Sequence, residues 1–202
     1  MRIVHLLAAA VCLLTGPAVL IAQSAKPAAQ ESDAAYTKKA EGGAPSWISK
    51  DARIARLAKG GEVTVVREGS NDITCASVPE MGIPAVCADK NGWEWMTSAM
   101  AAKDKPSTSE PGVAYMMQGG THFETADGQI MMEPSSKTHN VKEPPHWMLL
   151  WPFDPAKSGL PTYPNPGGAY LMFAGTPYAH VMIYENPAKL KNPASKASSS
   201  GY

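Results

Sequence analysis

The segment from Ala169 to Tyr184 is the most apolar part of the chain outside its N-terminus, and it limits the possible folds more than any other segment. Its two halves, residues 169–174 and 179–184, are rich in the aromatic and branched side chains that are typical of β-strands. Between them, Gly175 and Pro177 provide the backbone freedom and the fixed φ of a tight turn. The sequence therefore predicts a hairpin here, as the buried centre of the fold.

Composition and charge limit the size of the protein and its partners. A chain of 202 residues with 44% hydrophobic and 18% charged residues can bury one sizeable core. We therefore expect a single globular domain over residues 46–187. Basic and acidic residues balance at 18 each, so the charge predicts neither a nucleic acid nor an anionic membrane as partner.

The N-terminus has the pattern of a signal peptide over residues 1–24. Arg2 precedes an apolar run from Leu6 to Ile21, and Ala22 and Ser24 are small residues at the positions that a signal peptidase recognises. The run is too short, and too interrupted by Gly and Pro, for a strong membrane span. We expect a periplasmic or extracellular protein, with no integral membrane span after cleavage.

Two polar segments flank the predicted domain. Residues 25–45 lack the apolar surface that would offset the entropy cost of ordering, so they are predicted to be a flexible leader. Residues 188–202 are rich in Lys, Asn, Ala and Ser and are predicted to be a disordered tail.

The pattern within the domain predicts an α+β fold, in which an antiparallel sheet carries two helices. The first helix is expected to begin at Ser46, to bury Ile54 and Leu57, and to end at Gly60. A hairpin follows, with strands at 62–67 and 72–75.

The second helix is expected to begin near Asn91, which can cap it, and to bury Trp93, Met96 and Met100. Further strands are predicted at 112–117, 129–133 and 146–151. Eight prolines between Pro134 and Pro166 predict long proline-rich loops.

Cys75 and Cys87 remain after removal of the signal peptide, and they enclose a segment that contains proline and glycine. In an oxidising compartment such a pair most often forms a disulfide. A redox or metal-binding thiol pair is the alternative, but reactive pairs usually stand two residues apart and a closed metal site needs four ligands. We therefore predict one disulfide.

Two histidines stand in the same local pattern, His146-Trp-Met148 and His180-Val-Met182. Residues i and i+2 of a strand share a face, so each pair would present an imidazole beside a thioether. Two such pairs could surround one copper ion, particularly Cu(I). The alternative is that the methionines fill the core while each histidine binds a backbone carbonyl. Methionine is scattered through the sequence, which favours this packing interpretation.

Catalysis has less support in the sequence. We find no G-x-S-x-G elbow, phosphate-binding loop, H-E-x-x-H motif or dinucleotide fingerprint. His122, Glu124 and Asp127 could form an acid–base cluster, although charged residues after a Gly-Gly turn are usually part of a solvated loop. A triad that assembles only in space leaves open a hydrolase-like enzyme around His122, His146 or His180.

The first hypothesis for function is a non-catalytic module that binds a small ligand or an envelope protein. Long loops in a compact domain often bind ligands. Trp147, Trp151, Tyr163 and Tyr178 would line an aromatic surface on these loops. The alternative is that these aromatic side chains only cap the core. The copper-binding protein and the hydrolase-like enzyme are the second and third hypotheses, and the first requires no cofactor.

Five blocks of sequence also carry a family resemblance. They are residues 69–75 (GSNDITC), the second cysteine with the following Asp89, residues 115–120 (YMMQGG), residues 145–148 (PHWM) and residues 175–183 (GTPYAHVMI). Together they resemble a family of uncharacterised exported bacterial proteins over about residues 50–184. Ile73 stands where that family has an aromatic residue. The resemblance implies export and one domain, and it transfers no catalytic residues.

Overall fold

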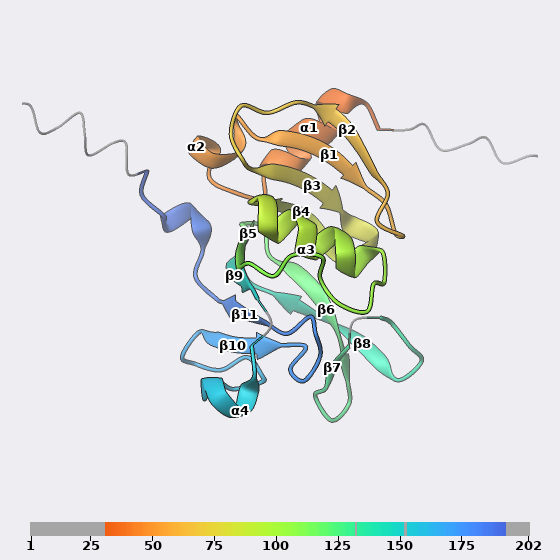
Figure 1. Cartoon of the computed structure of the whole chain (residues 1–202), viewed down its shortest axis with the longest axis vertical. Coiled ribbons are helices and arrows are strands. Elements are labelled where there is room, and N and C mark those ends of the chain that lie inside the picture. Colours follow the sequence, from red (N-terminus) through yellow and green to blue (C-terminus); the bar gives the residue numbers. More distant parts are fainter. Residues whose placement is uncertain (1–30, 132, 152, 193–202) are drawn as a thin grey trace, which may run out of the picture. The chain divides into compact units, whose positions relative to one another are not determined.

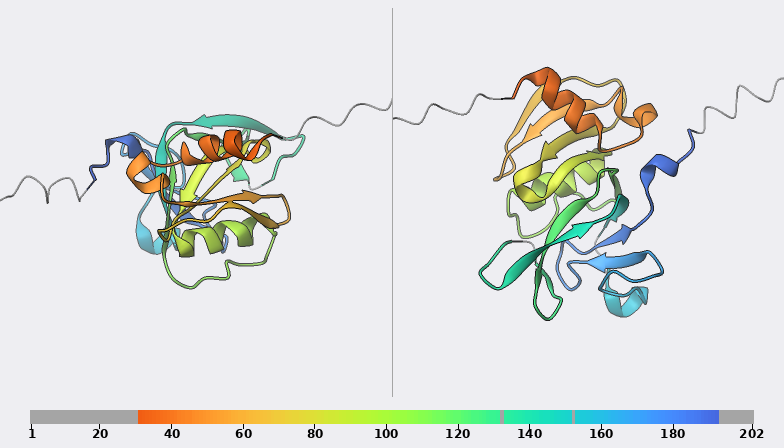
Figure 2. Two further views of the ribbon diagram at one scale, coloured as in Figure 1. Left: turned by 90° about the horizontal axis from the view of Figure 1, so that it is seen from above. Right: turned by 180° about the vertical axis from the view of Figure 1, so that it is seen from behind.

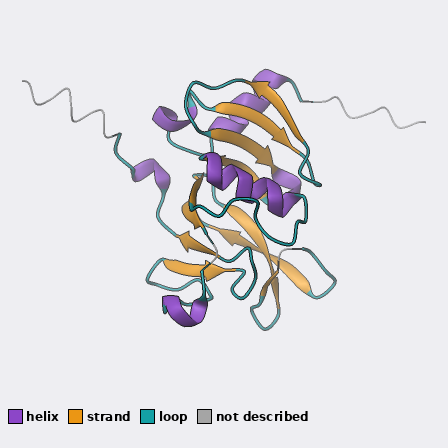
Figure 3. Ribbon diagram, in the orientation of Figure 1, coloured by secondary structure: helices purple, strands orange, loops and turns teal. Residues whose placement is uncertain are grey.

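The computed structural model describes residues 31–131, 133–151 and 153–192 (Figure 1). The predicted signal peptide, the start of the leader and most of the predicted tail lie outside the described residues. The described part is an α+β fold with an eight-stranded sheet, a three-stranded sheet and two helices longer than one turn (Figure 3).

The main sheet has the strand order β10-β11-β9-β5-β4-β3-β1-β2. Its first four strands in chain order are β1 (Arg53–Leu57), β2 (Val63–Arg67), β3 (Thr74–Val78) and β4 (Ile83–Ala88). The other four are β5 (Gly112–Met116), β9 (His146–Leu150), β10 (Ala169–Met172) and β11 (His180–Ile183). Because β1 and β3 run parallel, the sheet is mixed, and the prediction of an antiparallel sheet is wrong at this pair.

The second sheet has the order β7-β6-β8, with strands β6 (Gly120–Thr125), β7 (Ile130–Met131) and β8 (Thr138–Glu143). Its strands β6 and β8 continue β5 and β9 of the main sheet. The pairing of β5 with β9 ends at Met116 and His146, and the pairing of β6 with β8 begins at Gly120 and Glu143. Strands β5 and β6 together pair with β9 and β8 as one two-stranded ribbon, which we call the ribbon. It bends between the two sheets, with Gly119 on one strand and two prolines on the other.

The two longer helices cover opposite faces of the main sheet (Figure 2). Helix α1 (Asp33–Glu41) packs on β3 and β4, over a core cluster that contains Ile54 and Cys75. Helix α3 (Lys90–Met100) packs mainly on β5, over the larger core cluster. The remaining helical pieces are short: α2 (Ser46–Ser49), α4 (Pro155–Ser158), and 3-10 turns η1 (Pro79–Met81) and η2 (Pro187–Lys189).

The first predicted helix is wrong beyond its first turn, since residues 53–57 form strand β1. Ile54 is buried in the cluster beneath α1, while Ala55 and Leu57 are buried in the cluster on the other face. A strand buried on both faces loses its alternation of polar and apolar residues, so its spacing can look helical. The predicted hairpin of 62–67 with 72–75 is also wrong, because β1 lies between these two strands.

The predicted flexible leader is wrong for its described residues from 33 onward, which form α1 and the turn after it. The Ser32 hydroxyl caps this helix by accepting a hydrogen bond from the Ala35 N–H. Tyr36 and Ala40 lie one turn apart and are 4% and 0% exposed. The Tyr36 hydroxyl donates to the Ala55 carbonyl at 2.9 Å and accepts from the Ser77 N–H at 3.0 Å. The contact of this polar helix with the sheet therefore combines a small apolar patch with the hydrogen bonds of the Tyr36 hydroxyl.

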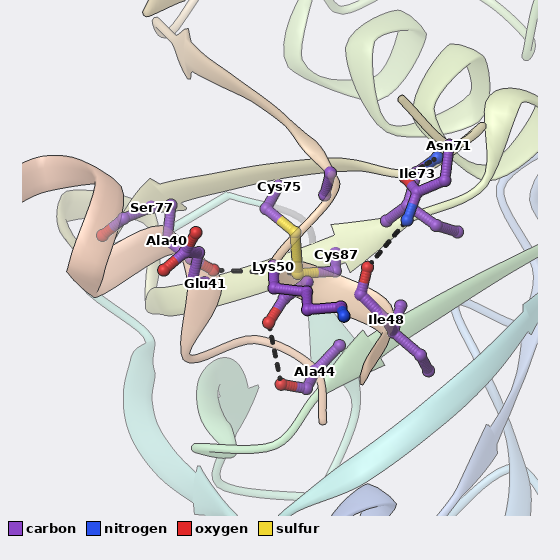
Figure 4. The surroundings of a disulfide bond; sticks show 12 residues. Ala40, Glu41, Ala44, Ile48, Lys50, Asn71, Ile73, Cys75, Ser77 and Cys87 are labelled. Carbon is purple, nitrogen blue, oxygen red and sulfur yellow. Dashed lines mark hydrogen bonds between the residues drawn. A yellow bond between two sulfur atoms is a disulfide. The ribbon is translucent and has the colours of Figure 1, made fainter. Parts of the chain in front are cut away.

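Cys75 and Cys87 form the predicted disulfide (Figure 4). They are direct partners in the antiparallel pair β3–β4, and both are fully buried beneath α1. The second predicted helix is also confirmed as α3, which buries Trp93 and Met96. Its cap differs from the prediction, because the Asp89 side chain accepts the Gly92 N–H at 2.7 Å.

The predicted C-terminal hairpin is confirmed by the pairing of β10 with β11. Tyr170, Leu171 and Met182 on it are at most 1% exposed. The hairpin nevertheless lies at one edge of the sheet and not at its centre. Predicted strands at 112–117 and 146–151 are confirmed as β5 and β9, while β6 and β8 form where the sequence predicts loops. No helix in the described part of the chain is long and apolar enough to span a membrane.

Candidate functional site

A cavity of about 170 Å³ lies between α3, the α3-covered face of the main sheet and the second sheet. Its lining includes eight of the chain's eleven methionines, so we call it the methionine cavity. Met96 and Met100 reach it from α3, and the main sheet contributes Met116, Met148, Met172 and Met182. Three histidines, His122, His146 and His180, also line it.

The fold brings both predicted His-x-Met pairs to this cavity, but on antiparallel strands, so that the two pairs run in opposite directions. Met148 and Met182 are direct partners in the antiparallel pair β9–β11. His146 precedes Met148 by two residues and His180 precedes Met182 by two, so the histidines lie at opposite ends of this pairing. At roughly 3.3 Å per residue, their backbones are separated by about 13 Å along the strands. This register argues against one ion that is held by all four side chains.

A group of ionisable residues lies at the end of the cavity, beneath the bend of the ribbon. His122 lies between two carboxylates, with Nδ1 2.9 Å from Glu143 Oε1 and Nε2 3.0 Å from Glu124 Oε2. His122 is 5% exposed and Glu143 9%. We call His122, Glu124, Glu143 and the adjacent His146 the polar corner.

Hydrogen bonds determine which members of the polar corner carry a charge. Burial lowers the pKa of His122, but its hydrogen bonds to Glu143 and Glu124 outweigh burial and raise that pKa above its usual value. Burial likewise raises the pKa of the Glu143 carboxyl, and the hydrogen bond from His122 reverses this, so the net shift is downward. Both shifts favour the charged forms, an imidazolium beside a carboxylate.

Glu143 has a further donor in Tyr170, whose hydroxyl lies 3.2 Å from Oε1. The Tyr170 hydroxyl is also 3.1 Å from that of Tyr184. Burial raises the pKa of both tyrosines, that of Tyr184 to about 12, so both remain neutral. Oε1 of Glu143 thus receives two hydrogen bonds, from His122 and Tyr170.

His146 is fully buried and has one free ring nitrogen. Its Nδ1 lies 2.7 Å from the Pro144 carbonyl oxygen and must carry the proton, because a carbonyl only accepts. Its Nε2 is therefore an acceptor, and it has no hydrogen-bond partner among the described residues. Glu143 Oε2 is 3.8 Å away, too far for a hydrogen bond. Burial lowers the pKa of His146, so it stays neutral.

His180 has the same tautomer, with Nδ1 2.9 Å from the Tyr178 carbonyl oxygen. Burial lowers its pKa to about 4. Its ring packs edge-on against the rings of Trp95 and Phe173. The alternative interpretation, in which each histidine of a His-x-Met pair binds a backbone carbonyl, therefore describes both His146 and His180.

The remaining candidates for catalysis are placed less favourably. Both ring nitrogens of His122 are hydrogen bonded to carboxylates, so neither is free to activate a nucleophile. Asp127 lies exposed in the turn between β6 and β7, and His139 is exposed on β8. The arrangement resembles an ion-pair network more than a triad.

The four predicted ligand-binding aromatics do not gather on one surface. Tyr178 is 4% exposed, packs on Trp95 and donates to the Lys103 carbonyl. Trp147 alternates with His146 along β9 and so faces away from the cavity. Trp151 and Tyr163 are 47% and 45% exposed, but Trp151 packs on Phe153 whereas Tyr163 lines a separate groove.

Sequence reasoning missed Glu143, Tyr170 and Tyr184 as members of the site. One feature of the sequence could have indicated Glu143: it is a carboxylate three residues before a histidine and directly before two prolines. No feature of the sequence indicates the two tyrosines, because apolar strands often contain tyrosine.

Comparison of the chain with protein-family models, with curated proteins and with solved structures finds no match. The resemblance to a family of exported bacterial proteins therefore stays a prediction. The methionine cavity, with its polar corner, is the basis for a proposal about function.

Proposed function

We propose that this protein is an exported, non-catalytic module that binds a small, largely apolar ligand in the methionine cavity. One observation carries the proposal: methionines converge on this cavity from α3, the main sheet and the second sheet. Methionine side chains are flexible and polarisable, and they are common at surfaces that adapt to apolar ligands. A few polar groups at one end are typical of small-molecule sites.

The size of the cavity is consistent with such a ligand. A dry, apolar cavity of about 150 Å³ is large enough for benzene. At about 170 Å³, the methionine cavity could hold a ring with one or two further heavy atoms. The buried disulfide is consistent with export, since disulfides persist in oxidising compartments.

The test uses toluene as a probe and protein with ¹³C-labelled methionine methyl groups. We expect toluene to shift the methyl signals of cavity residues such as Met96, Met116 and Met148. Met117 does not line the cavity, so its signal should not move and serves as an internal control. Saturable shifts confined to cavity methionines would support the proposal, whereas equal shifts at Met117, or none at all, would refute it.

A variant that fills the cavity provides an independent check. Met148 lies on the cavity floor, directly opposite Met182. Met148→Trp should abolish the response to toluene, while the control Met117→Leu should retain it. If Met148→Trp fails to fold, a series of larger probes on the unaltered protein gives the same information, since binding should stop once the ligand exceeds the cavity.

A second candidate function, Cu(I) binding, is favoured by one specific pairing. Met172 is the direct cross-strand partner of His180, and Met182 shares its strand face, so one imidazole has two thioethers as neighbours. All three line the cavity. The Nδ1–H of His180 binds a carbonyl, as is usual for histidines that ligate metals through the other nitrogen. This set replaces the predicted set of His146, Met148, His180 and Met182.

Titration with Cu(I) against a competing chelator tests this second function. Met172→Leu and Met182→Leu should each weaken binding, while Met148→Leu, at the same cavity, should not. Equal affinity in all three variants, or no binding by the unaltered protein, would refute the copper site.

A further inference from the structure

The polar corner presents two acceptors to the methionine cavity. The first is Nε2 of His146, buried and without a partner in the described part of the chain. The second is Glu143 Oε2, 3.8 Å from it. Neither atom can donate a proton to the other, because Glu143 is ionised and His146 carries its proton on Nδ1. A buried acceptor without a donor is unfavourable, so Nε2 of His146 needs a group with an N–H or O–H bond. A group with at least two such bonds could donate to Glu143 Oε2 as well.

The charge of the corner favours a cation. Its one imidazolium, His122, lies between the carboxylates of Glu143 and Glu124 and can neutralise only one of them. The other ion pair at the cavity, Lys59 with Glu133 at 3.4 Å, is neutral by itself. One negative charge therefore remains unbalanced at the polar corner.

From this geometry we infer that the ligand of the methionine cavity is a small primary amine, whose ammonium group lies between Glu143 Oε2 and His146 Nε2 and whose apolar body contacts the methionines. This inference rests on the proposed function. An ammonium has three donors and no acceptor, so it satisfies both atoms and balances the charge. A single hydroxyl donates only once, and a carboxylate would add a second negative charge.

The experiment compares ligands that share a benzyl body: benzylamine, benzyl alcohol, toluene and benzoate, titrated into the full-length protein at pH 7. We expect benzylamine to bind about tenfold or more tightly than toluene, because its charged hydrogen bonds add to the same apolar contacts. Benzoate should bind most weakly. Benzyltrimethylammonium keeps the charge but has no donor, so it should lose the advantage of benzylamine.

The matched variant is Glu143→Gln, which keeps the shape of the side chain and removes its charge. Within this variant the preference for benzylamine should disappear, so that the ratio of its affinity to that for toluene falls to about one. If this variant does not fold, the ligand series on the unaltered protein decides alone. Toluene binding without a preference for benzylamine would overturn the inference and leave the proposed function in place. Absence of binding by every ligand would overturn both.

Discussion

The imidazole of His122 and the carboxylate of Glu143 face each other across the paired strands β6 and β8, with Nδ1 and Oε1 2.9 Å apart. The two residues are 21 positions apart in the sequence, and both are almost fully buried. Their pairing places two ionisable side chains together in the core, with Oε2 of Glu143 3.8 Å from the free nitrogen of His146. The stability of this corner and any ligand binding there should therefore depend on the same carboxylate.

Removal of that carboxylate should destabilise the protein strongly. Glu143→Gln leaves the buried imidazolium of His122 with only Glu124, and loss of one partner of a buried ion pair costs about 3–5 kcal/mol. The side chain of Glu124 is 23% exposed. Glu124→Gln should therefore cost clearly less. Urea unfolding of both variants measures the two effects, and equal losses would show that the two carboxylates hold His122 equally.

Acidification should destabilise the protein through His180. The unfolded chain takes up a proton on this residue near the usual histidine pKa of about 6.5, whereas the folded pKa is about 4. Between these values the unfolded state binds more protons, so the free energy of unfolding falls as the pH falls, by about 3 kcal/mol in total. Burial of His146 acts in the same direction.

Urea unfolding at several pH values between 7 and 4 measures this loss. His180→Gln should flatten the dependence. His122 acts oppositely, because its folded pKa is raised: its contribution is complete below pH 6.5 and is lost as the pH rises through the folded pKa. An unaltered slope in His180→Gln would contradict the prediction.

Gly119 should tolerate no side chain at the bend of the ribbon. It has φ of +70°, and an added Cβ would clash with the backbone carbonyl of Glu143. Gly175 has φ of +81° but open space around it. Gly175→Ala should cost only the penalty of the left-handed backbone, about 1–2 kcal/mol, and Gly119→Ala considerably more. Thermal unfolding compares the two, and equal losses would mean that the bend accommodates the methyl group.

The docking of α1 should depend on Tyr36. Tyr36→Phe removes the hydroxyl that accepts the Ser77 N–H and donates to the Ala55 carbonyl, so it should destabilise the protein by about 1–3 kcal/mol. Tyr36→Ala also removes the buried ring and should cost about 3–5 kcal/mol. Lys38 is exposed on the same helix, and Lys38→Ala is the control. Stability unaffected by Tyr36→Ala would show that α1 does not belong to the folded domain.

The sequence predictions that the structure confirms are those that depend on residues close together in the chain. Proline on both sides of residues 146–151 confined that apolar run to a short strand, β9. The helical spacing of Trp93 and Met96 produced α3, and two cysteines around a turn paired. In contrast, Ile54 and Leu57 have the spacing of a helix face but belong to strand β1, which is paired with β2 on one side and with β3 on the other.

The arrangement of the predicted site residues also depends on strand direction and register. The pairing of His146 with Met148 was correct as a local relation, since both face the same cavity. The direction in which β11 runs beside β9 cannot be read from either segment, and this direction separates His146 from His180. The role of Glu143 could not be predicted from the sequence, because its contact with His122 forms only where the ribbon bends.

The sequence by itself determined the strands β5 and β9, the helix α3 and the C-terminal hairpin, and it indicated that two cysteines would be joined and that methionine would be abundant in the core. These features follow from backbone sterics, hydrophobic periodicity and residues close together in the chain. Only the tertiary structure decided that eight methionines would surround one cavity and that His122, Glu143 and His146 would meet at its end. Those contacts depend on strand order and register, which are set by the packing of segments far apart in the sequence.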